Sequence, residues 1–238
     1  MRGKARVFVV VPTYNEAENI ETLLEKILSI QDLWVIVVDD GSPDGTSSIV
    51  EEISKKDSRV LLINRGRKMG LGSAYQDGFK NALENEADVV VSMDADGSHP
   101  AELIPELVKA VEQGADVAVA SRYVEGGKWS AGFGRMMVSR GANFLAKLCT
   151  GVKMRDMTSG FRAYSATSLK NLLTKDFEKG YVFQAETIYR LSRKGFKIVE
   201  IPFFFQKRIS GKSKLSVREI VRFVAWCFKV LLSRLSGR

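Results

Sequence analysis

Two carboxylates one residue apart, Asp94 and Asp96, directly follow the apolar run at residues 89–93. A pair of acids at the end of a buried strand is costly unless positive charge holds it there. Mg²⁺ or Mn²⁺ suits carboxylate oxygens and can take phosphate oxygens at its remaining positions. The pair therefore predicts a metal that clamps a nucleotide diphosphate. A strand end with solvated acids is the alternative at this point.

Other acidic residues also follow expected strands. Runs rich in Val and Ile predict strands at residues 6–11, 34–38, 60–63 and 89–93, and helices are expected up to about residue 28 and over residues 47–53. This alternation is typical of a parallel sheet covered by helices on both faces. Ligands of such sheets bind at the carboxyl ends of the strands. Because Glu16, Asp40 and Asp96 fall at three of these ends, we expect a ligand site on that rim.

Composition indicates one domain with a sizeable core, since the chain has 238 residues and is 45% hydrophobic. Cys149 and Cys227 lie in apolar helical contexts and are expected to be reduced, buried thiols rather than a disulfide. The first apolar run is short and rich in Val, so we do not expect a signal peptide.

The formal net charge of +8 calls for an anionic partner, because the acids are expected at the rim and the basic residues elsewhere. Nucleic acid is not expected, since no helix-turn-helix, zinc or aromatic-platform motif accompanies the charge. An anionic membrane surface or a phosphorylated substrate remains. Many of the basic residues fall in the C-terminal half: Lys128, Arg135, Arg140, Lys147, Lys153, Arg155, Lys207, Arg208, Lys212 and Lys214.

Two basic segments have apolar residues at helical spacing, residues 135–148 and 216–235. For the first, a helix at a membrane surface and ordinary core packing are both open. In the second, the unbroken apolar stretch at residues 223–228 is far shorter than the roughly 20 residues that a bilayer span needs. We expect this segment to lie on a membrane or to dock on a partner helix.

A glycine pattern at Gly70 and Gly72 looks like the start of a dinucleotide-binding loop, but Tyr75 occupies the place of the third glycine. The pattern also follows the third expected strand, whereas a nicotinamide-binding enzyme carries its glycines after the first. We therefore expect these glycines to let a helix N-terminus pack closely on the sheet.

Several motifs together resemble family 2 glycosyltransferases of the GT-A fold, and within that family the polyprenyl-phosphate (dolichyl-phosphate) mannose synthases. The resemblance covers about residues 6–215, so it implies a catalytic domain at residues 1–215 and a surface or docking helix at residues 216–238. The motifs are PTYNE, DDGSPDGT, GLGSAYQDG, MDADGSHP, SRY, SRGANFL, TSGFR, GYVFQAE and a late R-x-x-G-x-S-K-L.

The resemblance implies an inverting transfer of mannose from GDP-mannose to dolichyl or polyprenyl phosphate. It places Asp96, Arg122, Arg208 and Lys214 in catalytic roles. Arg208 and Lys214 would close over the diphosphate and neutralise the departing GDP. The donor site would be lined by Pro12, Tyr14, Glu16, Val38, Asp40, Asp94, Ala95, Asp96, Arg208 and Lys214, the acceptor phosphate would be held by Arg122, Arg135 and Ser139, and the Mg²⁺ or Mn²⁺ would be held by Asp94, Asp96 and Ser98.

Three positions qualify this assignment. Ser98 stands where many relatives have Gln, and a hydroxyl is a shorter and weaker metal ligand. His99, the sole histidine, precedes Pro100 at an expected helix start, so a structural role is favoured. Glu186 lies near where relatives with hydroxyl acceptors keep a base. A phosphate acceptor is already anionic at pH 7, so we expect Glu186 to orient a neighbouring cation.

The same resemblance implies a peripheral enzyme at the cytoplasmic face of a membrane, where a small membrane-anchoring subunit is a possible partner. Two other functions stay open. One is a polyprenyl-phosphate glucosyltransferase or another family 2 transferase that uses a UDP-sugar. The other is a non-catalytic subunit that binds a nucleotide sugar.

Overall fold

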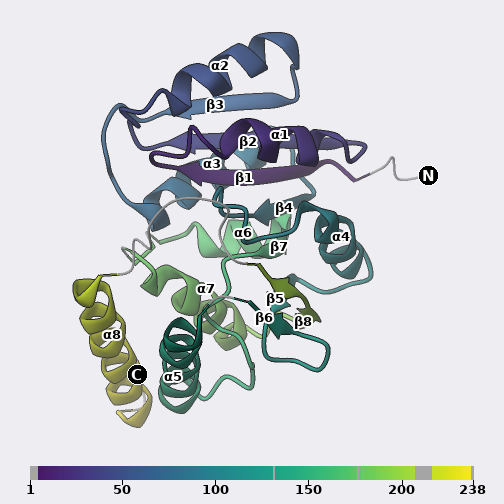
Figure 1. The fold of residues 1–238 in the computed structure, drawn as a ribbon. Coiled ribbons are helices and arrows are strands. Elements are labelled where there is room, and N and C mark those ends of the chain that lie inside the picture. The colour runs from purple at the N-terminus through teal and green to yellow at the C-terminus, as the bar shows by residue number, and fades with distance from the viewer. Residues whose placement is uncertain (1–4, 131, 176, 179, 207–215, 237–238) are drawn as a thin grey trace.

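A seven-stranded sheet forms the centre of the computed structural model, which describes residues 5–130, 132–175, 177–178, 180–206 and 216–236 (Figure 1). The strand order is β3-β2-β1-β4-β7-β5-β8. All neighbours are parallel except β7, which is antiparallel to β4 and to β5. The predicted, mostly parallel sheet is therefore confirmed. The strands are β1 (Val7–Thr13), β2 (Leu33–Asp39), β3 (Val60–Asn64), β4 (Val89–Ser92), β5 (Val117–Ser121), β7 (Arg162–Ser165) and β8 (Ile198–Pro202), and a separate parallel pair is formed by β6 (Lys128–Trp129) and β9 (Phe204–Phe205).

Helices cover both faces of this sheet. Successive side chains of each strand point to opposite faces, and because both faces are apolar, both are covered by helices. In β1, Val9 and Val11 belong to one layer and Phe8 and Val10 to the other. The first layer packs under α1 (Ile20–Leu28), α2 (Thr46–Lys56), the 3₁₀ helix η1 (Ala101–Leu103) and α4 (Ile104–Glu112). The second packs under α3 (Leu71–Glu84), α5 (Phe133–Thr150), α6 (Ala166–Leu172), α7 (Val182–Arg193) and α8 (Val217–Leu235).

The glycines before and within α3 set how closely this helix approaches its neighbours. Gly70 has φ +105, a conformation that side chains rarely adopt, and forms the turn into the helix. A Cβ on Gly78 would collide with Val10 of β1, so the close contact with the sheet lies there. At Gly72 a Cβ would lie 2.6 Å from the carbonyl oxygen of Glu178. The expected close packing is thus present, but Gly72 faces the segment before α7 rather than the sheet.

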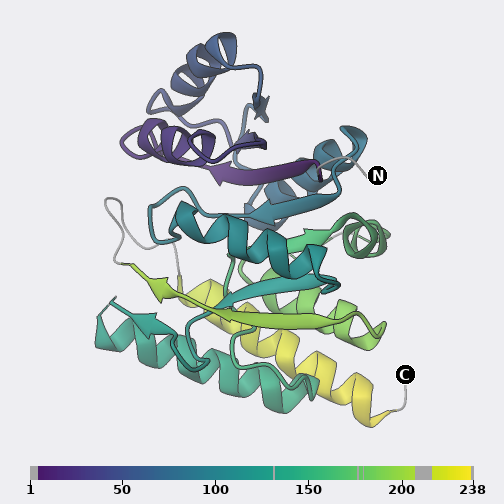
Figure 2. The same cartoon turned by 90° about the vertical axis from the view of Figure 1, so that its right-hand side faces the viewer.

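Helices α5 and α8 lie side by side and point in the same direction (Figures 1 and 2). Arg234, near the end of α8, donates from Nη1 to the carbonyl oxygen of Cys149 in the last turn of α5 at 2.8 Å. A cation at this position also suits the negative end of the α5 dipole. At the other end of α8, Ser216 caps the helix by accepting the N–H of Glu219.

The two faces of helix α8 lie in different environments, and the burial of one face in the core of this chain was not predicted for residues 216–235. Phe223, Trp226, Cys227 and Val230 are buried in the core, while its opposite face is exposed. We call the exposed apolar residues Val217, Val221, Phe228, Leu232 and Leu235 the α8 stripe. Within the described residues, no helix combines the length and apolar content that crossing a membrane requires.

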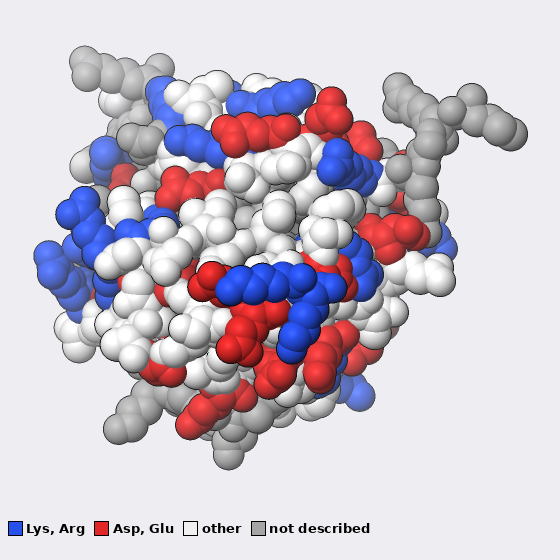
Figure 3. All heavy atoms as spheres, turned by 90° about the horizontal axis from the view of Figure 1, so that it is seen from above, with Lys and Arg blue, Asp and Glu red and all other residues white. Residues whose placement is uncertain are grey.

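The face seen from the α2 and β3 end carries both signs of charge (Figure 3). Acidic and basic side chains alternate over the middle of this face, so it offers no broad surface of one sign. The excess of basic residues must therefore be sought on other parts of the molecule.

Candidate functional site

The loops that follow β1 and β2 are joined to each other at the predicted rim. The backbone N–H groups of Asn15, Glu16 and Ala17 donate to Ser42 Oγ, Thr46 Oγ1 and Asp44 Oδ2 at 2.9, 3.0 and 3.0 Å. Because β1 and β2 are parallel neighbours, both loops leave the same edge of the sheet. The PTYNE and DDGSPDGT motifs thus form one hydrogen-bonded rim.

Asp39, the last residue of β2, connects residues of both loops of this rim through its buried carboxylate. It is fully buried and accepts from Ser42, from Ser47 Oγ and from Thr13 Oγ1. Burial alone would raise the pKa of Asp39, but these hydrogen bonds outweigh it and lower the pKa. Sequence analysis singled out Asp40 and missed the structural role of its neighbour.

Asp40 holds the turn before α3. One of its oxygens accepts from Nε and Nη2 of Arg65, and the other accepts from the N–H groups of Met69 and Gly70 at 3.2 and 2.9 Å. These four bonds use the acceptor capacity of a carboxylate. For Asp40 to accept a hydrogen bond from a ligand in the predicted donor site, it would have to exchange one of them.

The other residues predicted for this part of the donor site differ in accessibility. The ammonium group of Lys68 lies 4.0 Å from the centre of the Tyr14 ring, and Asn19 donates to the carboxylate of Glu16 at 3.0 Å. Pro12 is half-buried and is the register partner of Val38 in the parallel pair of β1 and β2. The side chain of Val38 is fully buried beneath α3, so only its backbone remains for a ligand at the rim.

Asp94 is oriented by two side chains that hold it from different sides. The hydroxyl of Tyr75 donates to Asp94 Oδ1 at 3.0 Å, and the Asp94 N–H donates to Nδ1 of His99 at the same distance. Burial, and then the charge of Asp94, raise the pKa of Tyr75 well above its ordinary value, so this hydroxyl keeps its proton. Tyr75, which stands in the place of the third glycine of the pattern described above, is therefore part of the site.

His99 is buried and has a structural role, as expected. Its ring stacks on Phe161 with centroids 5.0 Å apart, and the rings of Phe203 and Phe205 contact it edge-on. This aromatic box fixes the nitrogen that accepts from Asp94. His99 thus acts through the position of Asp94.

Asp96 and Ser98 complete the acidic turn. Asp96 is buried, and its Oδ1 accepts the N–H of Ser98 at 3.0 Å, while the side chain of Ala95 is in the core. The described residues bring no three His, Cys, Asp or Glu side chains together as a ready-made metal cage. Two carboxylates with a hydroxyl do fit Mg²⁺ or Mn²⁺ held partly by substrate phosphates. Asp94, 30% exposed at its side chain, is open to such an ion.

A cavity of about 330 Å³ begins beside this turn. At one end it is lined by Asp94, Ser98, Arg122, Arg135 and Ser139. At the other end, between α5 and α8, the lining is mainly apolar: Val138, Ala142, Leu145, Ile220, Phe223 and Val224. Glu219 of α8 also lines the cavity and is paired with Arg222. The cavity thus joins two predicted metal ligands, Asp94 and Ser98, to all three predicted acceptor-phosphate residues. Asp96 is not in its lining.

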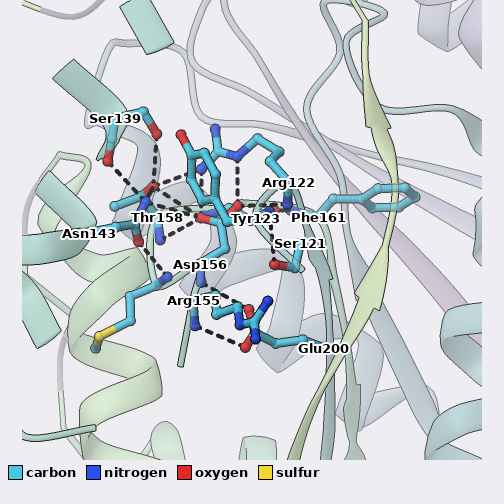
Figure 4. A network of polar contacts seen from close by, with 12 residues as sticks. Ser121, Arg122, Tyr123, Ser139, Asn143, Arg155, Asp156, Thr158, Phe161 and Glu200 are labelled. Carbon is cyan, nitrogen blue, oxygen red and sulfur yellow. Dashed lines mark hydrogen bonds and ion pairs between the residues drawn. The ribbon is translucent and has the colours of Figure 1, made fainter. Parts of the chain in front are cut away.

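Arg122 is held in a polar network at the side of this cavity (Figure 4). Its Nε and Nη2 donate to the two oxygens of Asp156, both at 2.7 Å, and Nη2 also donates to Thr158 Oγ1. The rings of Trp129, Tyr123 and Phe205 lie 4.9, 5.4 and 5.4 Å from its guanidinium carbon. No described residue accepts from Nη1, so its two N–H groups remain for a ligand.

Asp156 is the main residue of this network that sequence analysis missed. It is fully buried and accepts from Arg122 and from the N–H groups of Thr158 and Ser159. Burial would raise the pKa of Asp156, but the charge and hydrogen bonds of Arg122 lower it overall. The signal was present in the sequence, since an Asp two residues before Thr158, in Asp-Met-Thr-Ser-Gly, is typical of a side chain that closes a turn.

The remaining predicted residues are placed as follows. Ser139 Oγ lies 3.5 Å from Thr158 Oγ1, and Arg135 lies over the ring of Phe205 at 5.6 Å. Glu186 accepts from the N–H of Glu178 and lies 3.5 Å from Arg190, so it does pair with a cation, but it lines a different cavity from Asp94. Arg208 and Lys214 lie outside the described residues.

The acidic strand ends of a mostly parallel sheet and the adjoining cavity are the features of a GT-A glycosyltransferase. The family model described as glycosyl transferase family 2 matches residues 8–173, and the chain belongs to this family.

Two curated relatives are similar over most of their length. The chain is 39% identical to the polyprenol monophosphomannose synthase of Mycolicibacterium smegmatis, with 100% of this chain and 92% of the relative aligned. It is 40% identical to the undecaprenyl-phosphate mannosyltransferase of Micrococcus luteus, over 89% and 88% of the two chains.

Solved structures share the fold. A glucosyl-3-phosphoglycerate synthase from Mycobacterium tuberculosis, in complex with phosphoglyceric acid, is 22% identical and has a TM-score of 0.69, with 97% of this chain and 80% of that one covered. A mannosyltransferase from Pyrobaculum calidifontis, in complex with GDP-Man and Mn²⁺, is 16% identical and has a TM-score of 0.63, with 99% and 75% covered.

Proposed function

We propose that this enzyme transfers mannose from GDP-mannose to a polyprenyl phosphate, with inversion at the anomeric carbon. The observation that carries the proposal is the cavity between α5 and α8, which is polar beside Asp94 and apolar beside Phe223. An acceptor with an anionic head and a hydrocarbon tail matches both ends. The names of the two curated relatives support the same acceptor and sugar.

In this proposal the chain positions two anions next to each other. Arg135, Ser139 and Nη1 of Arg122 bind the acceptor phosphate, whose oxygen is already ionised at pH 7 and needs no base. This agrees with the place of Glu186 in a separate cavity. Tyr75 and His99 keep Asp94 oriented toward the donor.

Asp94 and Asp96, with Ser98, would hold Mg²⁺ or Mn²⁺. When bound, the ion would neutralise charge on the diphosphate that leaves. Arg208 and Lys214 remain predicted to close over the same diphosphate. The proposed place of action is the cytoplasmic face of a membrane, because the phosphate of such an acceptor lies at the bilayer surface.

The test is transfer by the purified protein. Radiolabelled GDP-mannose and polyprenyl phosphate should give a lipid-soluble, acid-labile product, and unlabelled GDP-mannose should compete better than UDP-glucose. A product formed only from UDP-glucose would instead support the glucosyltransferase. Binding of either donor without turnover would support a non-catalytic subunit.

A further inference from the structure

A second cavity lies on the opposite side of α5 from the acceptor cavity. It has a volume of about 460 Å³ and shares only Arg122 with the first. Helix α5 lines the first cavity with Ser139, Ala142 and Leu145, and the second with Arg140, Phe144 and Lys147. The two cavities therefore use different faces of one helix.

The second cavity is basic. Arg140 and Lys147 of α5 and Arg155 of the following loop line it, and no Asp or Glu is among the described residues of its lining. None of these three side chains forms an ion pair with a described carboxylate. Two nearby acids are engaged elsewhere, since Asp156 binds Arg122 and Glu200 accepts the backbone N–H of Arg155. Glu125, next to the lining residue Val124, is exposed and is not part of the lining. Three cations around one hollow repel one another unless an anion lies between them.

An exposed apolar surface borders this cavity. Phe133, Met137, Phe144 and Leu148 of α5, which we call the α5 stripe, are 74%, 49%, 72% and 61% exposed. Their spacing places them on one side of the helix. Phe144 belongs both to this stripe and to the cavity lining, and Arg140 and Lys147 are its neighbours one turn away in each direction.

We propose that this basic cavity binds the phosphate of an anionic membrane phospholipid. The headgroup phosphate would lie between Arg140, Lys147 and Arg155, and the acyl chains would begin along Phe144. Arg140 is already positioned by the ring of Tyr123, 5.8 Å from its guanidinium carbon. Such a site would fix the rotation of α5 at the membrane, and with it the direction in which the acceptor cavity opens.

The test uses dihexanoyl-phosphatidylglycerol below its micelle concentration, titrated by calorimetry into the full chain. We expect saturable binding of one lipid per chain. The double substitution Arg140→Gln/Lys147→Gln should weaken this binding about tenfold or more, which corresponds to the loss of about one charge-assisted hydrogen bond. The matched control is Arg218→Gln/Lys229→Gln, which removes the same charge from α8 outside the cavity and should bind as the unaltered chain does. Arg135→Gln, in the acceptor cavity, should also leave binding unchanged.

Two further ligands identify the source of the phosphate. Dihexanoyl-phosphatidylcholine carries a cation that the basic cavity should repel, and inorganic phosphate lacks the acyl chains, so both should bind more weakly. If the α8 control variant loses as much lipid affinity, the effect comes from net charge alone, and the proposed site is wrong. A loss of lipid affinity in Arg135→Gln would mean that the lipid binds in the acceptor cavity instead. If inorganic phosphate binds as tightly as the lipid, the cavity is not a lipid site.

Discussion

Asp156 shows how much of this site depends on a residue that touches no substrate in the proposed reaction. Its carboxylate neutralises Arg122 inside the protein, and the pair leaves Nη1 for a ligand. Breaking a buried pair from one side leaves a buried, uncompensated charge. The partly exposed pair of Asp57 and Arg59, with side chains 27% and 35% exposed, keeps contact with water, so breaking it should have a smaller consequence.

The substitution Asp156→Asn should therefore lower the free energy of unfolding by about 3–5 kcal/mol, measured by urea denaturation. The same substitution at Asp57 is the control and should cost about 1 kcal/mol or less. If the two variants lose equal stability, the Arg122 pair is not the buried anchor described above.

The lowered pKa of Asp156 also predicts a pH dependence. A carboxyl with a lowered folded pKa contributes fully above its ordinary value of 3.8, and the contribution is lost as pH falls through the lower folded value. The unaltered chain should lose stability in acid more steeply than Asp156→Asn, when both are unfolded by urea between pH 3 and pH 7, a window set by that ordinary value. Parallel curves would contradict the assignment.

Asp94 and Asp96 are predicted to act through a divalent ion. Asp96→Ala should abolish transfer and weaken binding of GDP-mannose in the presence of Mn²⁺, because the diphosphate then lacks its counter-charge. Asp88→Ala removes an exposed carboxylate at the other end of β4 and should leave both unchanged. Donor affinity and turnover that EDTA does not alter would show that no metal is required.

At the scale of elements, the contact between α5 and α8 keeps both cysteines inside. Burial, and then Cys149, raise the pKa of the Cys227 thiol to about 12. At pH 8 only about one thiol in ten thousand would then be ionised, and the thiolate is the reactive form. Neither cysteine should react with Ellman's reagent until the protein is denatured, whereas Val221→Cys on the exposed face should react at once. Fast reaction of the unaltered chain would mean that α8 separates from α5.

Removing α8 is a poor test of membrane binding. Deletion after residue 215 would expose the core partners of Phe223 and Trp226, so the remaining chain would lose stability as well as its surface. Phe228 and Leu232 are 52% and 66% exposed and can be changed without touching the core.

The sequence predicted the four strands of the N-terminal half well. The apolar runs became β1 to β4 with their ends within two residues, because two apolar layers need such runs. It predicted the end of the first helix near residue 28 but not its start at Ile20, since the N–H groups of residues 15–17 donate to side chains of the next loop, Ser42, Asp44 and Thr46. The antiparallel strand β7 was not predicted, because pairing across 70 residues leaves no local pattern.

For the site, sequence motifs predicted which residues meet in the acceptor cavity but not what holds them. Asp94, Arg135 and Ser139 do line one cavity. Asp156, Tyr75 and Asp39 were missed, because their roles depend on partners distant in the sequence and on burial. The positions of Arg208 and Lys214 remain predictions.

At the scale of the whole molecule, the α5 and α8 stripes and their basic residues lie on neighbouring helices. We expect binding to anionic vesicles that weakens with salt, because attraction of about 1 kcal/mol per basic residue is screened. The apolar contribution to vesicle binding should persist at high salt. The double substitution Phe228→Ser/Leu232→Ser should reduce it, as measured by vesicle flotation. A chain that stays with the soluble fraction at low salt would favour a membrane-anchoring subunit instead.

The volume of the acceptor cavity limits what the proposed enzyme can recognise of its lipid. About 330 Å³ lies near the lower end of the roughly 300–1,000 Å³ that is typical of small-molecule pockets. We therefore expect the cavity to take the phosphate and only the first carbons of an isoprenoid chain. Acceptors from short prenyl phosphates upward should therefore have the same kcat/KM in matched detergent, and a rate that rises with every added isoprene unit would contradict this. Such a transferase would distinguish lipids by their head and first unit, and would serve cells whose polyprenols differ in length.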